Sequence, residues 1–202
     1  MTKKISALDR VVLLATGLLA AYQIVVGVDK VHALAGVAYT LAFGVLLIAG
    51  LLLIIFGFDA LASPHVIVVA ALIPVGLATG LIAQFIPEWG GAFALLALVG
   101  LLALAITRYR APKKIATLVL ILTHGSTGLV IFVLPLASSA RGDAPPGFAL
   151  VGVGGALIGI GGLLLAFLKT GKPLLSEKMI LTVLPGLLLL MTALFVAGFA
   201  LV

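Results

Sequence analysis

The sequence predicts an all-α integral membrane protein with seven transmembrane helices, forming a single domain over residues 1–202. Its residues are 64% hydrophobic and only 9% charged, whereas a soluble domain carries about 25% charged residues. The apolar residues fall into long segments, and a bilayer is the solvent that accommodates so much apolar surface. The basic residues gather at alternate breaks between these segments, which is typical of a multi-pass chain.

Seven apolar segments follow one another along the chain, and each holds between 18 and 27 residues. About 20 helical residues are needed to cross ~30 Å of hydrocarbon. The breaks contain charges, prolines and glycines that favour turns, as in Pro87-Glu88-Trp89-Gly90, and they are too short for a soluble domain. The first segment follows a basic start, and we interpret it as a membrane helix rather than a signal peptide. The predicted spans are roughly 9–28, 32–58, 65–87, 91–108, 114–138, 147–168 and 176–201.

The placement of lysine and arginine predicts the orientation of the chain. With a cytoplasmic N-terminus, ten basic residues fall on the inner side, and only Lys30 and Arg141 fall on the outer side. Because basic residues favour the cytoplasmic side, we expect the N-terminus inside and the C-terminus outside the cell membrane. The ten inner residues are Lys3, Lys4, Arg10, Arg108, Arg110, Lys113, Lys114, Lys169, Lys172 and Lys178.

A weak internal repeat is present in the sequence. The stretch HALAGVAYTL (32–41) resembles FALVGVGGAL (148–157), and each precedes a segment with a mid-segment proline, Pro74 or Pro185. The pattern predicts two parallel halves in a three-plus-one-plus-three order, which at the level of fold alone is similar to sugar transporters with parallel repeats. Apolar segments also resemble one another by chance, so both interpretations stay open.

The placement of ionisable residues argues against most membrane chemistry. All six acidic residues lie at segment ends or in the breaks, whereas proton- and ion-coupled machines carry buried charges. The chain has no cysteine, which excludes disulfides, thiolate metal sites and cysteine nucleophiles. Catalytic pairs and metal-binding motifs are also missing from the sequence at a useful depth, so it favours a protein that is not an enzyme. Orientation and anionic lipid explain the net charge of +6 without nucleic acid.

The three histidines are the remaining residues that could bind a cofactor. His124 lies about ten residues into its segment, which places it ~15 Å deep at 1.5 Å per residue. His32 and His65 begin segments on opposite sides of the membrane. These different depths argue against a bis-histidine haem within one chain, and His32 and His65 are expected to be interfacial. The sequence requires no cofactor, but His124 or His32 could ligate a haem or chlorin together with a partner's ligand.

His124 stands in the polar stretch LTHGSTGL (122–129). Ser126 and Thr127 can donate hydrogen bonds to their own helix, and the glycines permit close approach, which favours a polar seam between helices. The alternative is a contact to a ligand, cofactor or quinone. A second polar set is expected in the outer half of the first three segments, as a small cavity or as interhelical hydrogen bonds. It comprises Tyr22, Gln23, Tyr39, Thr40 and Gln84.

Glycines at four-residue spacing predict close helix packing. Without Cβ atoms, helices approach until van der Waals and Cα–H···O contacts hold them. The sixth segment carries most of these glycines, and its smooth face could instead accept a flat ligand, a lipid tail or a neighbouring subunit. The predicted packing glycines are Gly152, Gly155, Gly159, Gly162, Gly76 and Gly80.

Three classes of function fit the sequence. The first is a non-catalytic subunit or scaffold of a larger membrane assembly, such as a bioenergetic complex, with other membrane subunits or further copies of the chain as partners in the bilayer. The second is a transporter or channel for a small neutral or apolar solute. The third is an electron-transfer or pigment subunit that binds haem or chlorin. Short breaks and few buried polar groups favour the first class.

Overall fold

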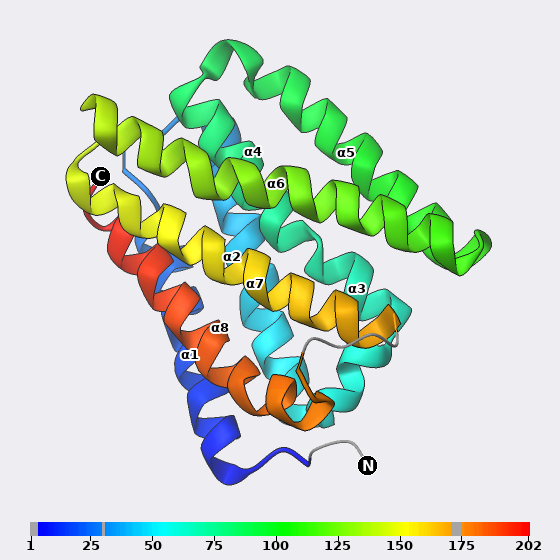
Figure 1. Ribbon diagram of the computed structural model, residues 1–202. Helices are drawn as coiled ribbons and strands as arrows, with labels where there is room; N and C mark the ends of the chain where they lie inside the picture. Colours follow the sequence, from blue (N-terminus) through cyan, green and yellow to red (C-terminus); the bar gives the residue numbers. More distant parts are fainter. Residues whose placement is uncertain (1–3, 30, 171–174) are drawn as a thin grey trace.

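The computed structural model describes residues 4–29, 31–170 and 175–202, and these residues form an all-helical structure (Figure 1). The side chains of residues 113 and 166–170 are not described. The elements are α1 (Ala7–Val26), α2 (Ala33–Phe56), the 3₁₀-helix η1 (Gly57–Ala62), α3 (Pro64–Ala70), α4 (Leu72–Phe85), α5 (Pro87–Arg110), α6 (Lys113–Arg141), the 3₁₀-helix η2 (Pro146–Phe148), α7 (Ala149–Thr170) and α8 (Glu177–Phe199).

Seven helical stretches within the described residues are long and apolar enough to cross a membrane. This confirms the predicted number of spans and indicates a multi-pass membrane protein. Each stretch coincides with one predicted segment, with ends that differ by a few residues. The stretches are Ala7–Val26, Ala33–Ala62, Pro64–Phe85, Pro87–Arg110, Lys114–Arg141, Pro146–Leu165 and Glu177–Phe199.

The third span consists of two helices, α3 and α4, which meet at Ala71. Pro74 explains this break, because its ring lacks an N–H and crowds the carbonyl four residues earlier, that of Ala70. Pro185 occupies a comparable place in α8, and that helix continues through it. Among the described spans, proline therefore interrupts the third one only.

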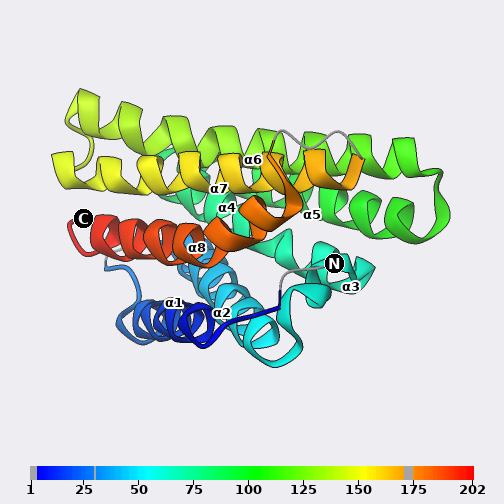
Figure 2. The same cartoon turned by 60° about the horizontal axis from the view of Figure 1, so that its bottom comes forward.

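Six helices pack in a closed ring in the order α1, α2, α4, α6, α7 and α8, with α8 returning to α1. Figure 2 shows α1 and α2 on one side, α6 and α7 on the other, and α4 and α8 between them. The remaining long helix, α5, packs on α4, α6 and α3 from outside the ring. The fold is thus a six-helix ring with one peripheral span.

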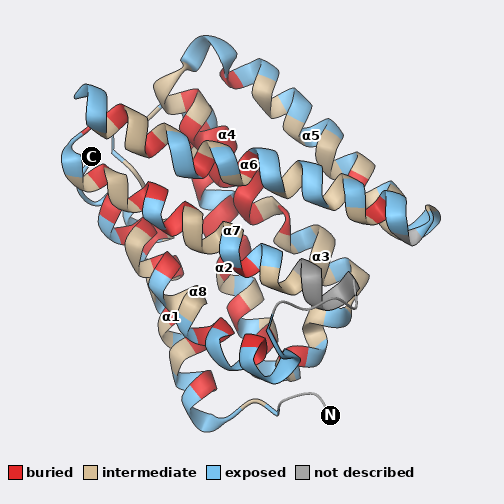
Figure 3. Ribbon diagram, viewed as in Figure 1, coloured by how far each residue is buried: buried red, intermediate tan, exposed pale blue. Residues whose placement is uncertain are grey.

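The interior of the ring holds the largest group of buried side chains, and α2 and α4 contribute most to it. Every residue of α4 from Ile73 to Leu81 is buried, and Figure 3 shows this as a nearly continuous buried stretch. By contrast, α5 buries only Gly90 and Leu104. Because the surrounding solvent is lipid, the outward faces stay apolar although they are exposed.

The spans alternate in direction, so the bundle has two distinct ends. We call them the Trp89 end, with the α4–α5 turn and the end of α8, and the Arg110 end, with the α5–α6 turn and the start of α1 (Figure 1). At the Arg110 end, Tyr109 of α5 hydrogen-bonds Nδ1 of His65 on α3 at 2.6 Å. The described basic residues at that end are Lys4, Arg10, Arg108, Arg110, Lys114 and Lys178.

Candidate functional site

The pair Tyr39–Gln84 joins α2 to α4 inside the ring. Tyr39 is 2% exposed, and its hydroxyl donates a hydrogen bond of 2.7 Å to Oε1 of Gln84. Its ring lies against Gly80, where a Cβ would overlap the ring atoms. A buried hydroxyl needs a partner of this kind, because an unpaired polar group in apolar surroundings costs free energy. The pair is therefore a satisfied interhelical contact.

Tyr39 also belongs to an aromatic cluster at the Trp89 end of the ring. Phe199 of α8 is its centre, with ring centroids 4.7 Å from Tyr39 and 5.8 Å from Phe148. Phe43 lies 6.0 Å from Phe199, and Phe85 lies 5.1 Å from Phe148. Tilted and edge-to-face pairs at such distances suit the quadrupoles of aromatic rings. The cluster fills the ring interior at this end with apolar side chains.

The other residues of the predicted second polar set lie apart from Tyr39 and Gln84. Tyr22 is 51% exposed on the outer surface of α1, and Thr40 is exposed on α2. Gln23 is buried, and its Nε2 donates to the carbonyl of Gly27 just beyond the end of α1. The structure thus brings two of the five residues together, and Gln23 closes a helix terminus instead.

His124 lies on the inward stripe of α6, where residues 127, 131, 135 and 138 are buried. The imidazole is half-buried. The Leu120 carbonyl, one turn earlier, interacts with it, yet Nδ1 lacks a partner with hydrogen-bond geometry among the described residues. A buried nitrogen without a full hydrogen bond is costly, so His124 retains capacity for a further partner.

The neighbouring hydroxyls of Ser126 and Thr127 donate their hydrogen bonds to backbone carbonyls and not to the His124 side chain. Thr127 is buried and donates to the carbonyl of Thr123 at 2.8 Å, and Ser126 is exposed and donates to the carbonyl of Leu122 at 2.8 Å. Both hydroxyls therefore bond to their own helix, as threonine and serine commonly do in apolar surroundings. A Cβ at Gly125 or Gly128 would meet nothing within 4 Å. These two glycines are not points of close packing.

The remaining histidines lie at opposite ends of the bundle. His32 precedes α2 at the Trp89 end, is exposed, and makes no capping hydrogen bond with its side chain. His65 lies in the first turn of α3 at the Arg110 end and pairs with Tyr109. Among the described residues, three or more His, Asp or Glu side chains do not gather as a metal site would require. His124 is the one histidine inside the helical bundle.

The closest backbone approach of α7 to α6 occurs at Gly152 and Gly155. A Cβ at Gly155 would lie 2.9 Å from the carbonyl carbon of Ile131 and 3.0 Å from its oxygen. Pro135 explains why this carbonyl is accessible, because proline has no N–H to bond the carbonyl four residues earlier. A Cβ at Gly152 would lie 2.8 Å from the carbonyl oxygen of Phe132. Cα–H···O contacts can form at such distances.

Gly76 and Gly80 of α4 allow a similarly close approach to α2. A Cβ at Gly76 would lie 2.7 Å from the carbonyl oxygen of Ala38. By contrast, Gly159 and Gly162 have nothing within 4 Å of a Cβ, so α7 does not pack closely there. Sequence spacing did not identify three glycines at the contact between α7 and α8, each with a side chain or backbone atom under 3.0 Å from a Cβ. They are Gly154, Gly161 and Gly198.

No protein-family model, curated protein or solved structure matches this chain. The function must therefore be argued from the site itself. The described interior offers packed aromatic rings, one satisfied tyrosine–glutamine pair and one histidine with an incompletely bonded nitrogen. This arrangement can hold helices together.

Proposed function

We propose that this chain is a non-catalytic subunit or scaffold that packs within a larger assembly in the cell membrane, with its N-terminus in the cytoplasm. The observation that carries the proposal is the packed core of buried side chains in the interior of the six-helix ring. The aromatic cluster fills it at the Trp89 end, and a transported polar solute would need unpaired polar groups along its path. The outer surface is therefore where partners would act.

The buried threonines support this proposal. Thr16 donates to the carbonyl of Val12 at 3.0 Å, and Thr192 donates to that of Leu188 at 2.7 Å. Together with Thr127, these hydroxyls donate within their own helices, so their protons are not available to a solute in the ring. Two buried side-chain atoms of the described residues lack a hydrogen bond, Nδ1 of His124 and Oγ of Ser138. Two scattered atoms do not make a pathway.

The peripheral helix α5 is the surface best suited to a partner. It packs on the ring along one side only and exposes bulky side chains over most of its length. Its exposed residues include Leu95, Leu98 and Leu102, which follow one another at helical spacing on a shared stripe. A neighbouring transmembrane helix can pack on such a stripe by van der Waals contact.

Native mass spectrometry of the protein extracted in a mild detergent tests the proposal. We expect the wild-type chain to travel with other membrane subunits or further copies at a defined stoichiometry. Replacement of Leu95, Leu98 and Leu102 by alanine should dissolve this assembly without lowering the melting temperature, because these side chains are exposed. The matched control replaces three exposed leucines of α1 by alanine, and it should leave the assembly intact. They are Leu8, Leu14 and Leu18.

A wild-type chain that stays monomeric under every gentle condition would refute the scaffold proposal. The absorption spectrum of the same preparation also addresses the cofactor-bearing alternative. A stoichiometric Soret or chlorin band would favour an electron-transfer or pigment subunit, with His124 or His32 as a candidate ligand.

The order of helix contacts supports a second candidate, a transporter for a small neutral or apolar solute. Exchange of α1, α2 and α4 with α6, α7 and α8 leaves the order of neighbours around the ring unchanged. Such an order is compatible with the predicted three-plus-one-plus-three repeat, which stays a prediction, and repeats of this kind occur in transporters. Liposomes with reconstituted protein should then take up neutral solutes faster than empty vesicles, and equal rates over a broad panel would count against transport.

A further inference from the structure

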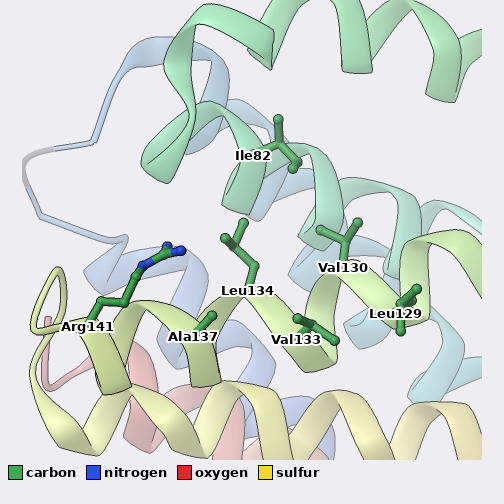
Figure 4. A pocket seen from close by; sticks show the side chains of 7 residues that line it. All are labelled: Ile82, Leu129, Val130, Val133, Leu134, Ala137 and Arg141. Atoms are coloured by element: carbon green, nitrogen blue, oxygen red, sulfur yellow. The ribbon is translucent and has the colours of Figure 1, made fainter.

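An apolar groove lies along α6 beside α4, in the half of the bundle towards the Trp89 end (Figure 4). Its volume is about 270 Å³, near the lower limit of ~300 Å³ for small-molecule sites. Ile82 of α4 forms one wall of it. The residues of α6 that line it are Leu129, Val130, Val133, Leu134, Ala137 and Arg141.

The position of α5 explains why the groove is open. At the α4–α5 turn, Gly90 packs on Ala83, and further along α5 Gly100 lies beside Thr123 of α6. From this contact back towards the Trp89 end, α5 and α6 diverge from each other, and α4 lies behind them (Figure 1). The side chains of Leu129 and Val133 therefore stay exposed, and the groove is accessible from the surrounding membrane.

The length of the groove corresponds to one leaflet of a bilayer. Leu129 and Arg141 are twelve positions apart on α6, which is ~18 Å at 1.5 Å per residue. Half of the hydrocarbon core is ~15 Å. A single acyl chain that starts at the membrane surface would therefore reach from Arg141 to Leu129.

Arg141 places a positive charge where the headgroup of such a chain would lie. It is the last residue of α6, and its side chain extends along the groove from the Trp89 end (Figure 4). Its Nε donates to Oδ2 of Asp143 at 2.9 Å. A guanidinium has five N–H donors, so the two terminal nitrogens can still bind phosphate oxygens while Asp143 holds Nε.

We propose that this groove binds one acyl chain of a phospholipid, with the guanidinium of Arg141 on the lipid phosphate. An apolar groove of leaflet length and a cationic mouth together match an apolar tail and an anionic headgroup. The proposal requires that the chain spans a membrane, and it does not require the scaffold function. It holds whether or not the chain is a scaffold, and its test does not depend on a partner subunit.

The test compares two lipids with the same acyl chains on delipidated full-length protein. Phosphatidylglycerol carries the phosphate and diacylglycerol lacks it, and native mass spectrometry measures how much of each stays bound. We expect wild type to retain phosphatidylglycerol preferentially. Arg141→Gln should lower this retention about fivefold, the factor for one basic residue at a membrane surface. Asp143→Asn should raise the retention of phosphatidylglycerol, because the substitution removes the carboxylate that pairs with the guanidinium of Arg141.

Variants that fill the groove separate the tail from the headgroup. Ala137→Trp should lower the retention of both lipids, because an indole would occupy the groove. The matched control Ala197→Trp places the same side chain on the exposed face of α8 near the same end, and it should change neither. Equal retention by wild type, Arg141→Gln and Ala137→Trp would overturn the proposal. A dimer that Ala137→Trp dissociates would assign the groove to a second copy and would overturn it as well.

Discussion

At the scale of single residues, the type of a polar side chain does not predict whether it is buried or exposed in this protein. Tyr22 and Gln23 are adjacent polar residues in α1, yet Tyr22 is half-exposed and Gln23 is buried against the helix terminus. Tyr39 has the same side chain as Tyr22, and it is buried inside the ring near the Trp89 end with Gln84 as its partner. The direction in which each side chain points decides its role, and this follows from helix packing.

His124→Leu tests the role of the one deep histidine. Because Nδ1 lacks a full hydrogen bond among the described residues, its removal should not lower the free energy of unfolding, and it should raise it by up to about 1 kcal/mol. The measurement is unfolding in a detergent titration. A loss of more than ~1 kcal/mol would show that the imidazole bonds a structural partner. If the spectrum has a haem or chlorin band and the variant loses it, His124 is a ligand.

At the scale of elements, α7 shows that one glycine-rich helix can serve two neighbours. Its glycines at 152 and 155 pack on α6, and those at 154 and 161 pack on α8. The contact to α6 uses the carbonyl that Pro135 leaves without a helical donor. Small residues allow both approaches because they remove the side chains that would separate the backbones.

Gly155→Ala tests this contact, with Gly159→Ala as the matched control on the same helix. The new Cβ at residue 155 would lie under 3.0 Å from atoms of Ile131, including its backbone, and backbone cannot move aside cheaply. We expect a loss of about 1–3 kcal/mol in the free energy of unfolding. At residue 159 the Cβ meets open space, so the change should be neutral or stabilising by up to ~1 kcal/mol. Equal effects of the two variants would contradict the described packing.

At the scale of the whole molecule, the fold is a ring of six helices with α5 outside it. Seven spans place the two termini at opposite ends of the bundle, as Figure 1 shows for the start of α1 and the end of α8. The described basic residues lie mostly at the Arg110 end. Their distribution predicts that this end faces the cytoplasm, and the direction in the membrane stays a prediction.

The absence of cysteine from the sequence makes this orientation simple to test. Asp29→Cys and Ala62→Cys introduce single thiols at exposed positions, the first near the Trp89 end and the second at the Arg110 end. In intact cells, a membrane-impermeant maleimide should label the cysteine at 29 and leave the one at 62 unlabelled until the cells are permeabilised. The reverse pattern would invert the predicted topology. The unmodified chain provides the blank.

The sequence by itself was sufficient to predict the all-helical class and the seven spans. Hydrocarbon thickness sets the length of a transmembrane helix, so segment lengths and the charged breaks between them are visible without a structure. Among the six predicted packing glycines, four lie at close contacts, whereas Gly159 and Gly162 do not; the four are Gly152, Gly155, Gly76 and Gly80. The spacing of glycines indicates that close packing is possible, and it does not say which face of the helix a neighbour will take.

Only the tertiary structure decided which faces meet. It placed α5 outside the ring, gathered five aromatic rings into one cluster that includes Phe199, and left a groove between Leu129 and Arg141. The physical reason is that lipid is as apolar as the interior of the protein. Hydrophobic periodicity, which marks the buried face of a helix in water, is therefore nearly absent here. Shape complementarity between helices, rather than polarity, determines which residues become core, surface or site.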